Sequence, residues 1–237
     1  MIDPIQYAIT SSGDVFLLEA NPQASCTVPS VSKAIGRPLS KYAALVMSSK
    51  FLKDLNFEEE VIPKHISMKE AVFPFEKFQG CDVILRPEMR STRQVMSISS
   101  ELPSAFAMAQ IVACQELPLT GTVFLNLNDM TKAHLEKITV SILDLGFKIV
   151  ATSGTSHFLE LKGIPVDRVL KSSGGDLDQK DGRQLRQMAL AYKVPVITTV
   201  ARALATPEGI KSLKSSVIKM TALHELFEVK NESFFLV

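Results

Sequence analysis

The chain has 237 residues, of which 46% are hydrophobic and 22% charged, which is enough apolar mass for one large or two small folded domains. The formal net charge is +1, which argues against nucleic acid or an anionic membrane surface as a partner. No apolar run reaches the roughly 18 residues that a membrane span needs. Residues 1–20 lack the basic start and apolar stretch of a leader, so we expect any targeting segment to lie outside this sequence.

Short strands and helices are expected in the first half of the chain. Two apolar runs flank Ser11-Ser12-Gly13-Asp14, a pattern that indicates a β-hairpin, and residues 20–30 are rich in Asn, Pro and Ser and predict irregular structure. The expected elements in chain order are a hairpin (5–10 and 15–19), a helix (38–49), two strands (69–73 and 94–98) and an Ala-rich helix (103–115).

Residues 116–121 are predicted to form a linker, because Pro118 and Gly121 interrupt both helix and strand. The order of the expected elements changes after this segment. Strands and helices then alternate. The expected strands are 122–127, 147–152, 166–170 and 194–200, and the expected helices are 131–145, 156–162 and 184–192. Asn128-Asp129 suits the start of the first of these helices and Gly146 its end. This alternation predicts a parallel, doubly wound sheet.

The hairpin holds a first candidate site. Glu19 and Asn21 are two residues apart, so an extended chain places both side chains on one face. Gln6 lies on the partner strand and can join them across the hairpin. Carboxylate and amide oxygens are suitable ligands for Mg²⁺ or Mn²⁺. The alternative is a solvated strand edge, because Glu and Asn are common on surfaces.

A second candidate site is the strand-to-helix turn of residues 151–156, Ala-Thr-Ser-Gly-Thr-Ser. Backbone N–H groups at a helix start, with neighbouring hydroxyls and a glycine, can hold a phosphate. Lys132 begins one neighbouring helix and Lys171 follows the next strand, so both cations are expected at the carboxyl edge of the sheet, where open α/β sheets bind ligands. An ordinary tight turn is the alternative.

Three segments carry a family resemblance. Residues 19–29 read EANPQASCTVP, 69–75 read KEAVFPF and 87–92 read PEMRST. They closely resemble the end of the ATP-grasp domain in the second synthetase half of carbamoyl-phosphate synthetases, and the chain from Thr122 onward resembles the methylglyoxal-synthase-like regulatory domain of the same enzymes. The similarity covers essentially the whole chain, and residues 144–161 look closest to the plant, plastid-type enzyme.

The resemblance implies an α/β fold class. Residues 1–116 would be the C-terminal remnant of an ATP-grasp domain with a helical linker, and residues 117–237 a doubly wound, methylglyoxal-synthase-like allosteric domain. It also implies the role of each matching residue. The implied metal ligands are Gln6, Glu19 and Asn21, the implied effector-phosphate residues are Lys132, Thr152, Thr155 and Lys171, and the further residues of the effector pocket are Thr198 and Thr199.

For the full-length enzyme the resemblance implies ATP-dependent ligation of bicarbonate and glutamine-derived ammonia, which serves arginine and pyrimidine biosynthesis. The implied cofactors are ATP with Mg²⁺ or Mn²⁺, and the implied effector is a nucleotide of the UMP type. The implied partners are the remainder of the large subunit and a glutamine-hydrolysing small subunit, and the implied location is the chloroplast.

The sequence also departs from the family pattern. Gln23 and Cys26 replace two arginines, which removes two guanidinium groups that bind phosphate, and Arg86 and Arg93 replace glycines beside turns. The resemblance implies that most of the nucleotide-binding region belongs before residue 1, outside the sequence given. After Lys171 a helix and a strand of the family are missing, about 20 residues at typical element lengths.

The resemblance favours a regulatory module that binds a nucleotide effector. There are two alternative functions. A methylglyoxal synthase activity would need an aspartate of that family which lies on the missing segment. An inactive, truncated fragment with only a structural role is the other alternative. We expect the chain alone not to catalyse carbamoyl phosphate synthesis.

Overall fold

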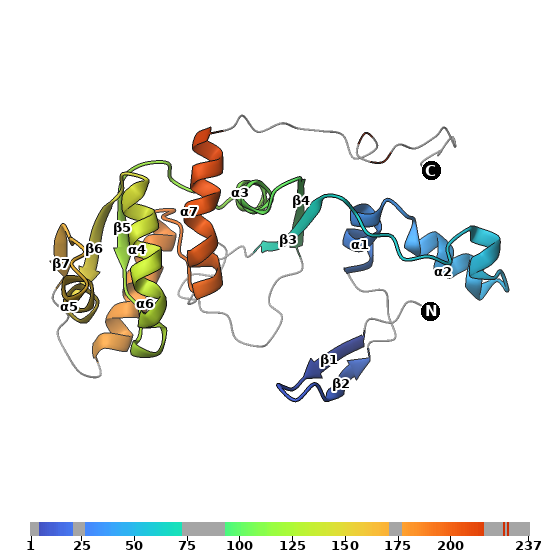
Figure 1. Cartoon of the computed structure of the whole chain (residues 1–237), viewed down its shortest axis with the longest axis horizontal. Coiled ribbons are helices and arrows are strands. Elements are labelled where there is room, and N and C mark those ends of the chain that lie inside the picture. Colours follow the sequence, from blue (N-terminus) through green and yellow to red (C-terminus); the bar gives the residue numbers. More distant parts are fainter. Residues whose placement is uncertain are drawn as a thin grey trace. The chain divides into compact units, whose positions relative to one another are not determined.

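The computed structural model of this chain describes residues 5–20, 27–72, 93–170 and 177–215, together with Glu225 and Phe227, and for Arg93 and 177–181 the backbone alone (Figure 1). The chain forms two compact units that divide between His65 and Ile66, and the second unit extends to Ile218. None of the described helices is long and apolar enough to cross a membrane.

The first unit starts with the expected hairpin, in which β1 (Ile5–Ile9) pairs with the antiparallel β2 (Val15–Ala20). Its turn is closed by the Thr10 N–H, which donates to the Asp14 carbonyl at 3.0 Å. The helical elements that follow are α1 (Thr27–Ile35), α2 (Leu39–Met47) and η1 (Leu52–Leu55). The prediction of irregular structure up to residue 30 was wrong from Thr27 onward, because α1 begins there.

The second unit begins with two antiparallel strands and a helix, as the sequence predicted. The strands are β3 (Ile66–Val72) and β4 (Arg93–Ser99), and the helix is α3 (Leu102–Val112) with Pro103 in its first turn. The remaining elements are β5 (Thr122–Leu125), η3 (Asp129–His134), α4 (Leu135–Asp144), β6 (Lys148–Thr152), α5 (Ser153–Leu161), β7 (Arg168–Leu170), α6 (Leu177–Ala191) and α7 (Val200–Ser215).

The three parallel strands form a sheet in the order β5-β6-β7, with α4 and α5 as the crossovers between them. One face of this sheet is packed. Ile149 and Ala151 of the central strand β6 are fully buried, because their side chains alternate to the same face. They lie among buried hydrophobic side chains of the sheet and of the helices that cover it, in a core of Phe106, Leu117, Leu125, Leu135, Ile138, Ile142, Phe147, Ile149, Leu159, Ile164 and Ile210.

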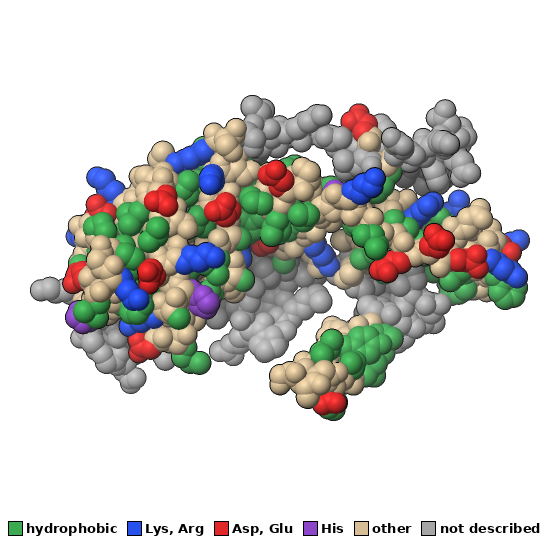
Figure 2. Space-filling model, viewed as in Figure 1, with side chains coloured by type: hydrophobic (Ala, Val, Ile, Leu, Met, Phe, Trp, Pro, Cys, Tyr) green, Lys and Arg blue, Asp and Glu red, His purple; other side chains and the backbone are tan. Residues whose placement is uncertain are grey.

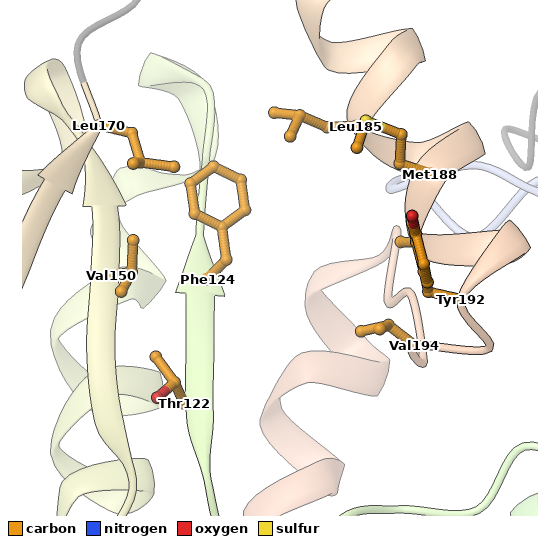
Figure 3. A pocket seen from close by; sticks show the side chains of 9 residues that line it. Thr122, Phe124, Val150, Leu170, Leu185, Met188, Tyr192 and Val194 are labelled. Carbon is orange, nitrogen blue, oxygen red and sulfur yellow. The ribbon is translucent and has the colours of Figure 1, made fainter.

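The other face of the sheet is not packed in the same way. Side chains of β5, β6 and β7 line one side of an open groove of about 430 Å³, and α6 lines the opposite side (Figure 3). The strand expected at 194–200 is absent from the described residues: 194–199 form no ladder, and α7 begins at Val200. The mixed α/β, parallel fold was therefore predicted correctly, but helices pack closely on only one face of the sheet.

Helix α7 closes the packed side by lying directly on α3. Gly209 makes this possible, because a Cβ on it would lie 2.9 Å from Cδ1 of Phe106, and Phe106 is itself buried. At the far end of the helix, Lys214 donates a 2.7 Å hydrogen bond to the carbonyl of Leu145, at the C-terminus of α4. The helix pair α3–α7 thus joins β3 and β4 to the three-stranded sheet in one unit.

We predict that Gly209→Val lowers the free energy of unfolding by about 1–3 kcal/mol, because the added side chain must displace a buried aromatic ring. Urea denaturation followed by circular dichroism measures the effect. The matched control is Gly182→Val on α6, where the added atoms meet only the end of the flexible Arg186 side chain. Equal loss of stability in the two variants would contradict the close α3–α7 contact.

Candidate functional site

The hairpin places two of the three expected metal ligands opposite each other. Gln6 and Glu19 are directly paired across the antiparallel strands, and the register shifts immediately after Gln6. Paired residues of an antiparallel ladder direct their side chains to one face, so an amide and a carboxylate can reach a common ion there. Asn21 lies outside the described residues. No group of three His, Cys, Asp or Glu side chains with metal-binding geometry occurs in the described part of the chain.

The surroundings of this pair are apolar and open. Hydrophobic side chains cover much of the visible hairpin in Figure 2, and both alternating faces of β2 carry them. The exposed members are Ile5, Tyr7, Ile9, Val15, Phe16, Leu17 and Leu18. A single carboxylate in contact with water holds a divalent cation weakly, so this edge can complete a metal site only with further oxygen ligands.

The second candidate site is the first turn of α5 with the residue before it, 152–155, which we call the anion turn. Thr152 is the N-cap of α5 in extended conformation, and its side chain makes no capping hydrogen bond. Its hydroxyl instead donates to Oδ1 of Asn126 at 3.3 Å and to Oγ1 of Thr155 at 3.2 Å. Thr155 is 1% exposed, so this side of the turn is fixed by packing. The helix therefore starts three residues earlier than expected, and its first N–H groups are not capped by Thr152.

The ammonium group of Lys132 faces the anion turn. Nζ of Lys132 lies 3.8 Å from the position that a Cβ would occupy on Gly154. The lysine is carried by η3, whose start is fixed by Oδ1 of Asn128, which accepts a 3.0 Å hydrogen bond from the Thr131 N–H. A glycine here leaves room for the cation beside the helix N-terminus. The turn thus combines uncapped N–H groups with a positive charge, the arrangement expected there from the sequence, and its assignment as a phosphate site stays a prediction.

Two polar residues of this site were not predicted from the sequence as part of it. Asp129 holds Nζ of Lys132 in a 2.6 Å ion pair, and the hydrogen bond together with the charge of Lys132 lowers the pKa of the Asp129 carboxyl below 3.8. Asn126 binds the hydroxyl of Thr152. Asn126 lies near the end of the expected strand at 122–127 and Asp129 follows that strand, so the rule that ligands gather at the carboxyl ends of parallel strands could have identified them. Asp129 had been interpreted only as a helix-start residue.

The structure brings together only part of the expected effector site. Lys132, Thr152 and Thr155 gather at the anion turn, whereas Lys171 lies outside the described residues. Thr198 and Thr199 are exposed just before α7, and Oγ1 of Thr199 accepts a 3.4 Å hydrogen bond from the Arg202 N–H. Within the described ranges no hydrogen bond joins these two threonines to the anion turn.

Residues 134–180 match the MGS-like domain family. The chain is 76% identical to an arginine-specific, chloroplastic carbamoyl phosphate synthase large chain of Arabidopsis thaliana, over 98% of the chain and 22% of that protein. A large chain of the same description from Oryza sativa subsp. japonica is 57% identical over 96% of the chain and 21% of its own length. The carbamoyl phosphate synthase large chain of Nostoc sp. is 44% identical over 93% and 22%.

The chain matches only part of each relative. The chain spans about a fifth of the length of the relatives. The Arabidopsis alignment runs over 255 residues, 18 more than the 237 of this chain, so that relative has at least 18 residues without a counterpart here.

We predict that Lys132→Met raises the pKa of Asp129 toward its ordinary value of 3.8, because both causes of the lowered pKa are removed. Carboxyl NMR during an acid titration measures it. In the wild type, the ion pair therefore stabilises the fold above the ordinary pKa of Asp129, and this stabilisation is lost as the pH falls through the lowered pKa. Lys137→Met on α4 is the control and should leave the Asp129 titration unchanged; an identical Asp129 pKa in both variants and the wild type would exclude the pairing.

Proposed function

We propose that this chain, a relative of the C-terminal region of carbamoyl phosphate synthase large chains, serves as a regulatory module that binds the phosphate of a nucleotide effector. The observation that carries the proposal is the approach of the Lys132 ammonium to Gly154 at the start of α5. The match of residues 134–180 to the MGS-like domain family supports it.

Three kinds of group at the anion turn suit a phosphate. The uncapped N–H groups of α5 point out of the helix start, where the helix dipole favours an anion. Lys132 adds a full positive charge, and the Thr152 hydroxyl adds a donor that can turn away from Asn126. Asp129 acts in the opposite direction, because its carboxylate already pairs with Lys132 and would repel the phosphate. Binding would therefore exchange the Asp129–Lys132 pair for a phosphate–Lys132 pair.

The remaining functional assignments belong to the whole large chain, of which this chain spans a fifth. We propose that Gln6, Glu19 and Asn21 supply one edge of an Mg²⁺ or Mn²⁺ site shared with ATP, which the pairing of Gln6 with Glu19 supports. The reaction would be ATP-dependent ligation of bicarbonate and glutamine-derived ammonia, with a glutamine-hydrolysing small subunit as partner. The product would enter arginine and pyrimidine biosynthesis in the plastid.

A second candidate is an inactive fragment with only a structural role, and two observations favour it. The sheet is packed on one face and faces an open groove on the other. The Arabidopsis relative has at least 18 residues that this chain of 237 lacks in an alignment over 255, so the chain is shorter than the matching region of that relative.

We predict that UMP binds the folded chain and that Lys132→Ala weakens this binding by roughly one to two powers of ten, the effect of losing one charge-assisted hydrogen bond of about 1.5–3 kcal/mol. Lys171→Ala should have a similar effect if that lysine joins the site. Isothermal titration calorimetry measures the affinities. Asp129→Asn should strengthen binding, because it removes the competing carboxylate.

The control for the UMP titration is Lys137→Ala, which removes a lysine of α4 that the anion turn does not involve. Equal affinity of the wild type and the Lys132→Ala/Lys171→Ala double variant would refute the assigned site. If neither protein binds UMP while circular dichroism shows the wild type to be folded, the inactive-fragment alternative is favoured.

We also predict that the purified chain makes no carbamoyl phosphate from bicarbonate, ammonia and ATP. The 237 residues span about a fifth of the Arabidopsis relative, and Gln23 and Cys26 stand where the family resemblance implies two arginines. A coupled assay for carbamoyl phosphate tests this. Turnover that Glu19→Ala abolishes would show the prediction to be wrong and would place the metal edge in a working site.

A further inference from the structure

Strand β5 has an open edge. In the described part of the chain it pairs only with β6. The Gly121 carbonyl accepts a 3.0 Å hydrogen bond from the Lys148 N–H, and alternate residues of a strand direct their backbone groups to opposite edges. The N–H and C=O groups of Val123 and Leu125 therefore face β6, and those of Thr122 and Phe124 face away from it.

The same two residues direct their side chains into the groove opposite α6 (Figure 3). Phe124 is 40% exposed there, and Met188 and Tyr192 of α6, on the opposite wall, are more exposed still. The nine lining residues include no charged side chain and are Thr122, Phe124, Val150, Leu170, Leu185, Met188, Ala189, Tyr192 and Val194. A strand that pairs with the β5 edge must therefore offer backbone hydrogen bonds and would lie beside an apolar groove.

We propose that the open edge of β5 pairs with β5 of a second copy of this chain, which forms a continuous sheet across the two copies. The pairing is antiparallel and two-fold, with Val123 of each copy at the axis. Thr122 of one copy then lies opposite Phe124 of the other, and all outward N–H and C=O groups of these two residues find partners. Because the paired residues differ by an even number, the groove faces of both sheets lie on the same side.

Three observations favour a second copy as the occupant. The two outward-facing residues are separated by one residue, which makes the edge complementary to itself about a two-fold axis. Natural edge strands are blocked by charges, prolines or bulges, and β5, which reads TVFL, has none of these. The relative from Arabidopsis has at least 18 residues more in its 255-residue alignment than this chain of 237, so an element that covers this edge there can be missing here.

Sedimentation velocity of the full chain over a wide concentration range tests the proposal. We expect a species of twice the 26.0 kDa chain mass that dissociates on dilution. Thr122→Pro removes one outward N–H at the first residue of an edge strand, where proline is tolerated, and the two-fold axis doubles its effect. It should raise the dissociation constant at least about tenfold, the equivalent of losing two hydrogen bonds.

The control is Val169→Pro on β7, the other edge strand. The Ile149 carbonyl accepts from the Asp167 N–H, so the backbone groups of Ile149 and Ala151 face β7. Val169 is the parallel partner of Ala151, so its own N–H faces away from the sheet. This variant should leave the dissociation constant unchanged. A second pair, Phe124→Lys against Val169→Lys, places a charge at either edge and decides the question if a proline variant fails to fold. A monomer at all concentrations, or a dimer equally sensitive to changes at both edges or to neither, overturns the proposal.

Discussion

The packing of one apolar face of a three-stranded parallel sheet determines the rest of the second unit. Ile149 of β6, Leu135 of α4 and Leu159 of α5 are fully buried, and each contributes about 1.5–3 kcal/mol relative to an exposed side chain. Because β6 is the central strand, this packing fixes where β6 ends and α5 begins. The same packing holds α4 and the preceding η3 at the neighbouring strand end. The short distance between Lys132 and Gly154 is thus a consequence of the core.

A polar cluster explains why the unit extends back to β3. The guanidinium group of Arg202, in the first turns of α7, donates to Oε1 of Gln110 on α3 and, at 2.7 Å, to Oε1 of Gln115, and lies 3.6 Å from Oε1 of Glu70 on β3. Gln110 is 1% exposed, so removal of the arginine would leave a buried amide oxygen unpaired. These contacts join Arg202, which follows the predicted linker at 116–121, to residues that precede this linker. The compact units therefore divide at His65, while the predicted family boundary near residue 116 stays a prediction.

Elements with a strong local pattern could be predicted from the sequence, and elements that depend on distant contacts could not. The hairpin and the strand at 147–152 were predicted correctly because alternation and turn residues lie within a few positions of each other. Residues 194–200 have strand propensity, but a strand also needs a paired neighbour, and none is formed. Helix α7 was not predicted because Pro207 and Gly209 oppose a helix locally, whereas contact with Phe106 stabilises it. At the site, the sequence predicted that Lys132 approaches the turn, but the Asp129 pair depends on side-chain conformation.

The anion turn and the expected pocket residues Thr198 and Thr199 differ in how the described sheet supports them. The anion turn follows β6, which has a partner on both sides, so its geometry does not depend on a further strand. Thr198 and Thr199 lie where the sheet was expected to continue, and they form no hydrogen bond with the anion turn among the described residues. If the turn binds phosphate as proposed, Thr198 and Thr199 are not tied to the bound phosphate through hydrogen bonds with the turn. Recognition would then rest on the charge of the phosphate, which all nucleotides share. A site discriminates between nucleotides when its buried polar groups pair with one base and are left unpaired by a different base. Binding through the phosphate alone would therefore discriminate poorly between nucleotides.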